Sequence, residues 1–331
     1  SINVSVEATT PAAAVERTIE SVSVWSGNAA TAYAGGSGTQ DDPYIIETAD
    51  QLYRALSIVT YTTSTTGDLA IETAGSVAGG WQSSRILKQG KTDVYVPVYT
   101  PYYYKIADGV EAMYLNDIRG NESLAGIKTF VSGSGKKTWN PASSFVGNLD
   151  GNGVTIYGIR SDDGNAGLFP FVDGDATIKN VTVKNSYLVG YTAGGLVGTV
   201  NGSAAPNSIT AENCQVINNY ISGSRGDCGP GGLFGFLYSS KATDGYPEIH
   251  VNNCIVAGNE LVAVSASAPG AFSFAGSFGG NRQHKIKNSI FLGGDGIFNT
   301  ASWWARQPSF YENVYTDTDL SGVAENYTTG T

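Results

Sequence analysis

A short pattern of alternating apolar and polar positions recurs along the second half of the chain. In each copy a marker residue separates two apolar stretches of period two, as in half-buried β-strands joined by a turn. The copies are ATIKNVTV (176–183), TAENCQV (210–216), HVNNCIV (250–256), KIKNSIF (285–291), FYENVYT (310–316) and, with Gly at the marker, VTIYGIR (154–160). The markers are Gly158, Asn180, Asn213, Asn253, Asn288 and Asn313.

The spacing of these markers is irregular, with steps of 22, 33, 40, 35 and 25 residues. Constant strands joined by loops of variable length are typical of a solenoid rather than of a helical repeat. We therefore expect an all-β, right-handed parallel β-helix of roughly six to eight coils, stacked about 4.8 Å apart. Asn suits the bend in each coil because it tolerates left-handed backbone angles, so the marker asparagines should form a ladder.

A glycine motif recurs once per copy, in AGGLVGTV (193–200) and PGGLFGFL (230–237), with a weaker form in NAGLFPFV (165–172). A phosphate-binding loop would need a following helix and usually a lysine, and neither copy has them. We interpret Gly195, Gly198, Gly232 and Gly235 as structural. They either allow close backbone approach or supply positive φ angles.

The predicted register places Val181, Cys214, Cys254, Ser289 and Val314 in one inward column. Cys214 and Cys254 then lie on adjacent coils, either as a disulfide or redox pair or as two buried thiols. The thiols are favoured, because side chains stacked in parallel rarely meet disulfide geometry. Cys228, in the loop SGSRGDCGPGG, is expected to be free.

The sequence upstream and downstream of the repeats suggests further segments. Residues 1–24 form an N-terminal segment or linker. Residues 25–60 hold a strand at 44–47 and a helix, capped by Thr48 with Gln51 three positions on, that would cover the open end of the β-helix. Residues 61–109 form a Tyr- and Thr-rich, hairpin-like insertion, 110–320 the parallel β-helix and 321–331 a C-terminal tail.

Composition narrows the possible partners. The 331 residues carry a net charge of −10 without a basic run, which argues against nucleic acid as a partner. No apolar stretch reaches the ~18 residues of a membrane-spanning helix. Two distant histidines and three cysteines without a CxxC predict neither a metal site nor a cofactor. Low Lys and abundant Thr, Ser and Asn suit a secreted or outer-surface bacterial protein, expected to be monomeric.

The motifs GLVG (195–198) and GLFG (232–235) resemble the GLUG motif of bacterial surface proteins, from which GLFP (167–170) departs at its last position. AGGSGTQDDPYIIETADQLYRAL (34–56) and FVGNLDGNGVTIYGI (145–159) also look like segments that precede such repeats in exported proteins of Bacteroides-like bacteria. The resemblance implies an adhesin-like solenoid. Some metallopeptidases carry GLUG repeats, but this chain has no HExxH, so that activity is not transferred.

Catalytic and metal-binding candidates have simpler structural interpretations. Glycoside hydrolysis needs two carboxylates about 5 to 9 Å apart. The candidate pairs are Asp162/Asp163, Asp173/Asp175 and Asp317/Asp319, and all occur in turn-like sequence. The calcium-loop candidates LDGNG (149–153) and VDGDA (172–176) also read as turns. The set His284, Lys285, Lys287 and Asp295 resembles the sites of pectin-degrading β-helices, but the two lysines flank the core position Ile286.

Aromatic clusters are the best binding candidates, because their flat faces suit sugars. The candidate ligand-binding residues are Tyr102, Tyr103, Tyr104, Trp303, Trp304 and Tyr311, although the same residues could instead pack the insertion or cap an end. We expect a non-catalytic, adhesin-like protein that binds a glycan or a host or neighbouring bacterial surface. The alternatives are a polysaccharide lyase or glycoside hydrolase with a groove along the β-helix, and a passive spacer.

Overall fold

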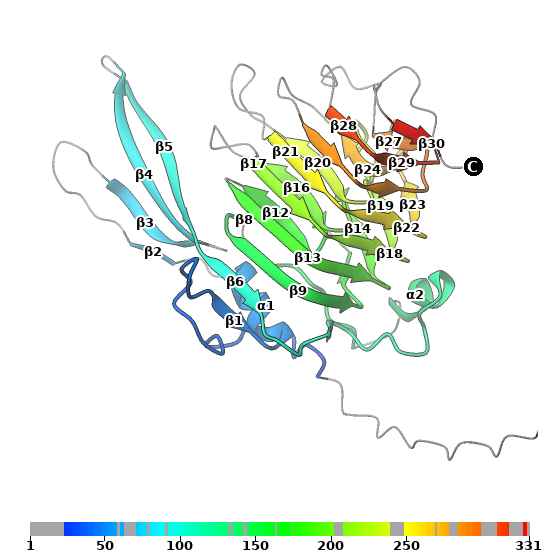
Figure 1. The fold of residues 1–331 in the computed structure, drawn as a ribbon, viewed down its shortest axis with the longest axis horizontal. Coiled ribbons are helices and arrows are strands. Elements are labelled where there is room, and N and C mark those ends of the chain that lie inside the picture. Colours follow the sequence, from blue (N-terminus) through cyan, green and yellow to red (C-terminus); the bar gives the residue numbers. More distant parts are fainter. Residues whose placement is uncertain are drawn as a thin grey trace, which may run out of the picture.

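The computed structural model describes residues 23–57, 60–62, 71–77, 80–89, 92–131, 133, 135–141, 144–162, 164–173, 175–201, 208–238, 248–268, 270–277, 284–298, 310–317 and 327–329. More than half of them lie in β-strands, and most of these strands pair in parallel with a strand from a neighbouring repeat (Figure 1). The all-β class with parallel sheets is therefore confirmed.

The largest sheet, here called the first sheet, has 14 strands and contains the marker motif. Its strands are β1 (Tyr44–Ile46), β6 (Tyr103–Ile106), β7 (Ala112–Tyr114), β9 (Asn148–Tyr157), β13 (Ala176–Lys184), β17 (Ser208–Glu212), β18 (Gln215–Ile217), β21 (Glu248–Asn252), β22 (Ile255–Ala257), β25 (Lys285–Lys287), β26 (Ile290–Phe291), β28 (Phe310–Glu312), β29 (Val314–Thr316) and β30 (Tyr327–Thr329).

Two further parallel sheets and one pair of strands are formed by the segments that connect the strands of the first sheet. The second sheet consists of β10 (Arg160–Ser161), β14 (Tyr187–Gly190), β19 (Tyr220–Gly223) and β23 (Glu260–Ala263). The third consists of β8 (Ser144–Phe145), β12 (Phe169–Asp173), β16 (Val197–Asn201), β20 (Phe234–Tyr238), β24 (Phe272–Ser277) and β27 (Gly296–Phe298), and β11 (Asn165–Ala166) pairs with β15 (Thr192–Ala193). From β9 to β24 the chain visits the first, second and third sheets in this order four times, and β25 and β26 are then followed directly by β27 of the third sheet.

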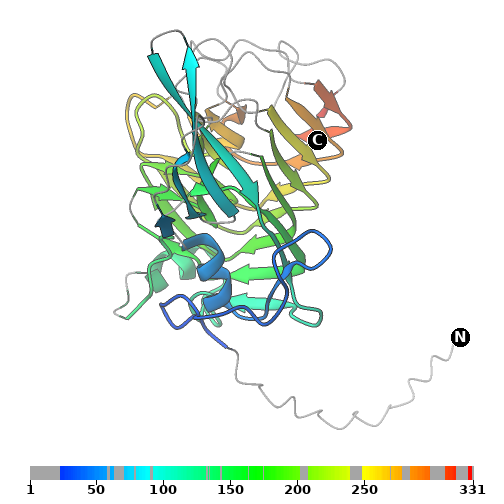
Figure 2. The same cartoon turned by 90° about the vertical axis from the view of Figure 1, so that its left-hand side faces the viewer.

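The hairpin-like segment forms a separate antiparallel sheet, seen at the left of Figure 1 and at the upper left of Figure 2. Its strands are β2 (Thr60–Thr62), β3 (Ile71–Val77), β4 (Gly80–Gln89) and β5 (Thr92–Pro101). The next strand, β6, already belongs to the first sheet, where it pairs with β1 and β9.

Two helices lie among the described residues, α1 (Ala49–Ser57) and α2 (Leu124–Val131). The expected cap of α1 is present: Gln51 N donates to Thr48 Oγ1, and Thr48 N donates to Gln51 Oε1, both at 3.3 Å. Leu52, Ala55 and Leu56 are buried as the pattern predicts. Helix α2 was not expected from the sequence. It begins after Ser123, whose Oγ accepts a bond from Gly126 N at 3.0 Å.

The marker asparagines form a hydrogen-bonded ladder, here called the first ladder. All five have positive φ, from 49° to 58°. Asn213 Nδ2 donates to Asn180 Oδ1 at 3.0 Å, Asn253 Nδ2 to Asn213 Oδ1 at 2.7 Å, and Asn313 Nδ2 to Asn288 Oδ1 at 3.0 Å. Asn288 donates instead to Asn252 Oδ1, at 3.0 Å, so this rung uses the neighbouring residue.

A second ladder corrects the assignment of Gly158. Strand β9 pairs Val154 with Val181 and Tyr157 with Lys184, which places Gly158 level with Asn185 rather than with Asn180. The second turn thus contains Gly158, Asn185, Asn218 and Gly258, all with positive φ. The turns of the first and second ladders are both flanked by alternating apolar and polar residues. The sequence pattern alone therefore did not show to which of the two turns Gly158 belongs.

The repeated glycines are buried where backbones approach closely. A Cβ on Gly195 would lie 2.2 Å from Val216 Cγ1 and 2.4 Å from Gly232 O, and one on Gly232 would lie 2.1 Å from Ser273 O. Neither glycine has a positive φ. Gly195 and Gly232 therefore allow neighbouring backbones to approach closely, and they do not supply positive φ angles.

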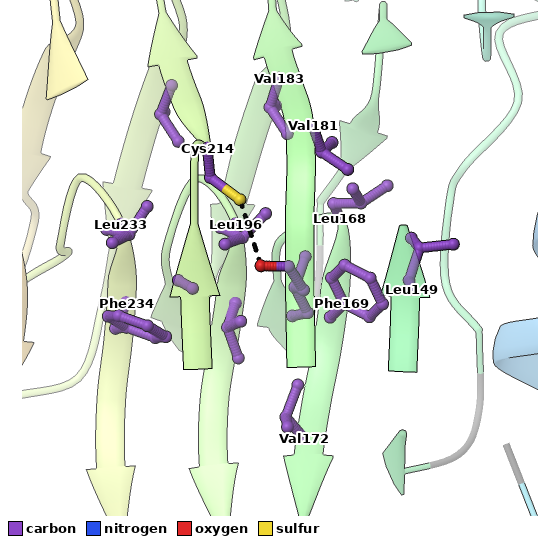
Figure 3. Close-up of a cluster of buried hydrophobic side chains, with 14 of the residues drawn as sticks. Leu149, Leu168, Phe169, Val172, Val181, Val183, Leu196, Cys214, Leu233 and Phe234 are labelled. Atoms are coloured by element: carbon purple, nitrogen blue, oxygen red, sulfur yellow. Dashed lines mark hydrogen bonds between the residues drawn. The ribbon is translucent and has the colours of Figure 1, made fainter. Parts of the chain in front are cut away.

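The interior is a stack of equivalent apolar side chains from successive passages. Leu168, Leu196 and Leu233 are fully buried and lie in one row, and Cys214 points into the same interior (Figure 3). The predicted inward column Val181, Cys214, Cys254, Ser289 and Val314 is at most 1% exposed. All three cysteines are free and buried. Burial raises the pKa of the Cys228 thiol to about 12, which makes it a poor nucleophile.

Candidate functional site

An open groove lies between the segment that leads into α2 and the outer surface of the first sheet. Its volume is about 550 Å³, within the range of small-ligand sites. The lining residues are Tyr114, Ile118, Arg119, Glu122, Tyr157, Lys184, Asn185, Ile217 and Asn218. They come from the ends of β7, β9, β13 and β18 and from the segment before α2 (Figure 1).

Two stacked tyrosines form the aromatic part of the groove. Tyr114 and Tyr157 occupy paired positions on β7 and β9, and their ring centroids are 4.9 Å apart with an interplanar angle of 12°. The Arg119 guanidinium lies 6.0 Å from the Tyr114 ring centroid. Partial burial, followed by the nearby Tyr157, raises the pKa of Tyr114, so this phenol stays neutral at physiological pH.

The other wall is held in place by polar contacts. Arg119 Nε and Nη2 donate to the two Asp117 carboxylate oxygens at 2.7 and 2.6 Å, and this pairing lowers the pKa of Asp117. Glu122 Oε1 accepts a bond from Gly120 N at 2.9 Å. Asn218 Nδ2 donates to Glu122 O at 2.6 Å, which ties the segment to the sheet.

Helix α2 anchors the same segment farther along the molecule. Lys128 Nζ contacts both Glu260 carboxylate oxygens, at 2.7 and 2.8 Å, and lies 5.2 Å from the Tyr220 ring centroid. Tyr220 stacks on Tyr187 with centroids 5.2 Å apart. This second tyrosine pair lies beside α2 and does not line the groove.

The aromatic residues chosen from the sequence lie elsewhere. Tyr104 and Tyr311 are only 4% and 1% exposed, so neither presents a ring face to solvent. Tyr102 is half-buried against Tyr44, with centroids 5.6 Å apart, and Tyr103 is half-buried on β6. For these residues the packing alternative describes the geometry. Trp303 and Trp304 lie outside the described residues.

The tyrosines around β1 and β6 form a packed cluster rather than a binding surface. Tyr33 stacks on Tyr44 at 4.5 Å and meets Tyr104 edge-on at 5.6 Å. Burial raises the pKa of Tyr33 to about 12 and that of Tyr104 still further. Such phenols serve as structural hydrogen-bonding groups and do not ionise under ordinary conditions.

Three acidic residues of the catalytic candidates are engaged in local contacts, while Asp163 and Asp319 lie outside the described residues. Asp162 pairs with Arg160 at 2.5 Å, Asp175 accepts from Ser208 N at 2.7 Å, and Asp317 accepts from Gly293 N at 2.8 Å. In the LDGNG turn, Asp150 accepts from Asn152 N and Asn180 Nδ2. No group of three or more potential metal ligands occurs in the described part of the chain.

The basic set around His284 does not converge on one site. His284 is buried, and its Nδ1 accepts a bond from Ile249 N at 3.2 Å. Lys285 pairs with Glu248 at 3.4 Å and Lys287 with Glu312 at 2.6 Å, while Asp295 accepts from Ala271 N at 2.9 Å.

Arg225 and Asp227, which flank Gly226 in the SGSRGDCGPGG loop, are likewise bonded to each other. The guanidinium of Arg225 also lies 3.8 Å from the Phe236 ring centroid. The charges of Arg225 and Asp227 are therefore paired with each other within the loop.

The groove residues were missed by the sequence interpretation, although a signal for two of them exists. AMY (112–114) and TIY (155–157) align at the same strand positions, so one further copy upstream would have paired Tyr114 with Tyr157. The other wall depends on where the segment before α2 folds, which the repeat does not encode.

Comparisons with known proteins do not assign a family. No protein-family profile matches the chain. Over 101 residues, 30% of its length, the chain is 31% identical to Halomucin of Haloquadratum walsbyi, and it spans about 1% of that protein. A crystal structure of a candidate immunoglobulin A1 protease from Bacteroides ovatus has a TM-score of 0.38 and 16% identity, with 86% of this chain and 78% of that chain covered.

The described helices are too short or too polar to cross a lipid bilayer.

Proposed function

We propose that this protein is a non-catalytic, adhesin-like binding protein, secreted or held at the outer bacterial surface, and that it takes glycans in the groove of Tyr114 and Tyr157. The stacked tyrosine pair in an open groove of about 550 Å³ is the observation that carries the proposal. Aromatic rings with polar groups beside them suit sugars, which present apolar C–H faces and hydroxyl groups together.

The scaffold in this proposal is a right-handed parallel β-helix, as the GLUG resemblance implies. The support is the repeated visit, from β9 to β24, to three parallel sheets in constant order. Connections between parallel strands of one sheet are right-handed in nearly all proteins. Loops of unequal length can then differ between repeats without disturbing the strands.

The charges in the groove favour binding over glycoside hydrolysis. Hydrolysis usually requires a pair of carboxyl groups across the scissile bond. Glu122 is the one carboxylate among the described lining residues, and the neighbouring Asp117 is held by Arg119.

A glycan array with the full chain tests this function. Tyr157→Ala should weaken binding of the glycans recognised by the unmodified protein about fivefold, since an aromatic contact contributes about 1 kcal/mol beyond area burial. Tyr187→Ala is the matched control, because it breaks an equivalent tyrosine stack outside the groove.

Equal binding by Tyr157→Ala and the unmodified protein would contradict the assignment of glycan binding to the groove. An equal loss of binding in Tyr157→Ala and Tyr187→Ala would also contradict it. Release of new reducing ends from a polysaccharide panel would contradict the non-catalytic assignment and favour the lyase or hydrolase alternative.

A further inference from the structure

The second ladder ends inside the groove with an unused donor. Asn218 Nδ2 donates to Asn185 Oδ1 at 2.8 Å. In the first ladder the corresponding end is closed, because Asn180 Nδ2 donates to Asp150 Oδ1 at 2.8 Å. In the second ladder the preceding position is Gly158, which has no side chain to accept a bond from Asn185 Nδ2.

The orientation of the Asn185 amide follows from its neighbours. Asn218 Nδ2 must be the donor to the backbone oxygen Glu122 O, at 2.6 Å, and the same nitrogen faces Asn185. The Asn185 atom facing Asn218 is therefore the oxygen, and Nδ2 lies on the opposite side of the amide. Asn185 is 3% exposed and lines the groove, and no described residue accepts a bond from its Nδ2.

Glycine is required at position 158, so the ladder cannot continue. Gly158 has a φ of 68°, and a Cβ there would lie 2.4 Å from Asn116 O. Asn116 is itself fixed, since its Nδ2 donates to Gly158 O and Lys137 O, each at 2.9 Å. The packing of this turn thus leaves Asn185 Nδ2 without a protein acceptor among the described residues and accessible from the groove.

A positive charge stands next to this donor. Lys184 precedes Asn185, lines the same groove and makes no ion pair within the described structure. Arg119, the other cation of the groove, is neutralised by Asp117. The Glu122 carboxylate, on the opposite wall, accepts a bond from Gly120 N and forms an ion pair with neither cation among the described contacts, so Lys184 is the cation available to a ligand.

We propose that the groove binds an acidic glycan, whose carboxylate or sulfate oxygens accept from Asn185 Nδ2 and pair with Lys184 Nζ. This inference rests on the proposed glycan-binding function and specifies the sugar class. Anionic oxygens accept a bond from an amide N–H and pair with an ammonium group more strongly than a sugar hydroxyl does.

Titration calorimetry with four probes tests the inference: a galacturonic acid trisaccharide, its methyl ester, a galactose trisaccharide and its 6-sulfate. Lys184→Met removes the charge while keeping the length of the side chain. Asn185→Asp keeps the oxygen that accepts from Asn218 and tolerates positive φ, but presents a second oxygen to the ligand. Lys285→Met is the control, because it removes one surface charge from the same sheet away from the groove.

Each variant in the groove should weaken binding of the acidic probes tenfold or more and that of the neutral probes less than twofold, with Lys285→Met unchanged. The carboxylate and sulfate probes distinguish the two sources of charge, and binding of either class with this dependence supports the inference. Lys184→Met decides the outcome if Asn185→Asp fails to fold.

If acid and ester bind equally well and Tyr157→Ala weakens both, the acidic class is wrong while glycan binding stands. If neither these probes nor the glycans of the array bind the unmodified protein, both proposals fail.

Discussion

At the scale of single residues, the turns depend on asparagine. Every non-glycine residue with positive φ in the described part of the chain is an Asn. For most other residue types the left-handed backbone conformation costs about 1–2 kcal/mol. The ladder amides add hydrogen bonds that link one passage to the next, so one residue type supplies both the bend and the link.

Asn213→Ala tests both contributions. The variant loses the bonds to Asn180 and Asn253 and places an alanine at a φ of 53°, so the free energy of unfolding should fall by about 2–3 kcal/mol. Asn213→Gly relieves the backbone strain and should lose about 1 kcal/mol less. Urea-induced unfolding measures the free energy of unfolding of both variants, and Asn140→Ala, at an exposed position, is the control. Equal losses of stability in Asn213→Ala and Asn213→Gly would contradict the role of the positive φ angle.

A buried histidine should make stability depend on pH. Burial lowers the pKa of His284 to about 4, the ionisable side chains of Glu248 and His250 are its neighbours, and its Nδ1 accepts from Ile249 N. The unfolded chain, with a histidine pKa near 6.5, therefore binds a proton before the folded chain does. The stabilising effect is complete above about pH 6.5 and is lost between about pH 6.5 and 4, by roughly 3 kcal/mol.

His284→Asn, which retains an acceptor but does not titrate, provides the comparison. Unfolding in urea at pH 7, 5.5 and 4.5 should show a smaller loss of stability in this variant, because its carboxylates titrate as in the unmodified protein. The same pH dependence in both proteins would show that His284 contributes nothing.

At the scale of elements, the strands of neighbouring passages pack closely because glycines leave room for the adjacent backbone. Gly195→Ala introduces a Cβ against Val216 and the Gly232 carbonyl, and the backbone oxygen cannot move without shifting a neighbouring passage. We expect a loss of about 3 kcal/mol in the free energy of unfolding. Gly35→Ala is the matched control, because the nearest atom to its Cβ would be 3.9 Å away. Comparable thermal stability of the two variants would count against the packing argument.

The two helices show what local sequence can and cannot specify. The start of α1 was predictable from Thr48 and Gln51, whose side chains form the expected reciprocal bonds. Helix α2 has eight residues, and its contacts reach across the chain, as from Lys128 to Glu260. Pairing over 132 positions leaves no periodic signal in a single sequence, so this helix and the groove wall it anchors were missed.

At the scale of the whole molecule, the parallel sheets were predictable because strand periodicity survives in every copy. The inward column from Val181 to Val314 could be listed in advance, since side chains on a strand alternate strictly. The groove could not be predicted in the same way, because it combines Tyr114 and Tyr157 with Asn185 and Asn218 across several passages. Its far wall belongs to an excursion between β7 and β8 that follows no repeat.

The direction of stacking also determines how the molecule responds to mechanical load. Val24 pairs with Tyr114 near one end of the first sheet, while β30 pairs with β29 at the other end. Tension between these ends acts along the interstrand hydrogen bonds and the asparagine ladders, so it separates passages one at a time, as in a zipper. Each released passage adds contour length while the remaining stack stays intact. We therefore expect this stack to yield in small steps under force rather than in a single rupture.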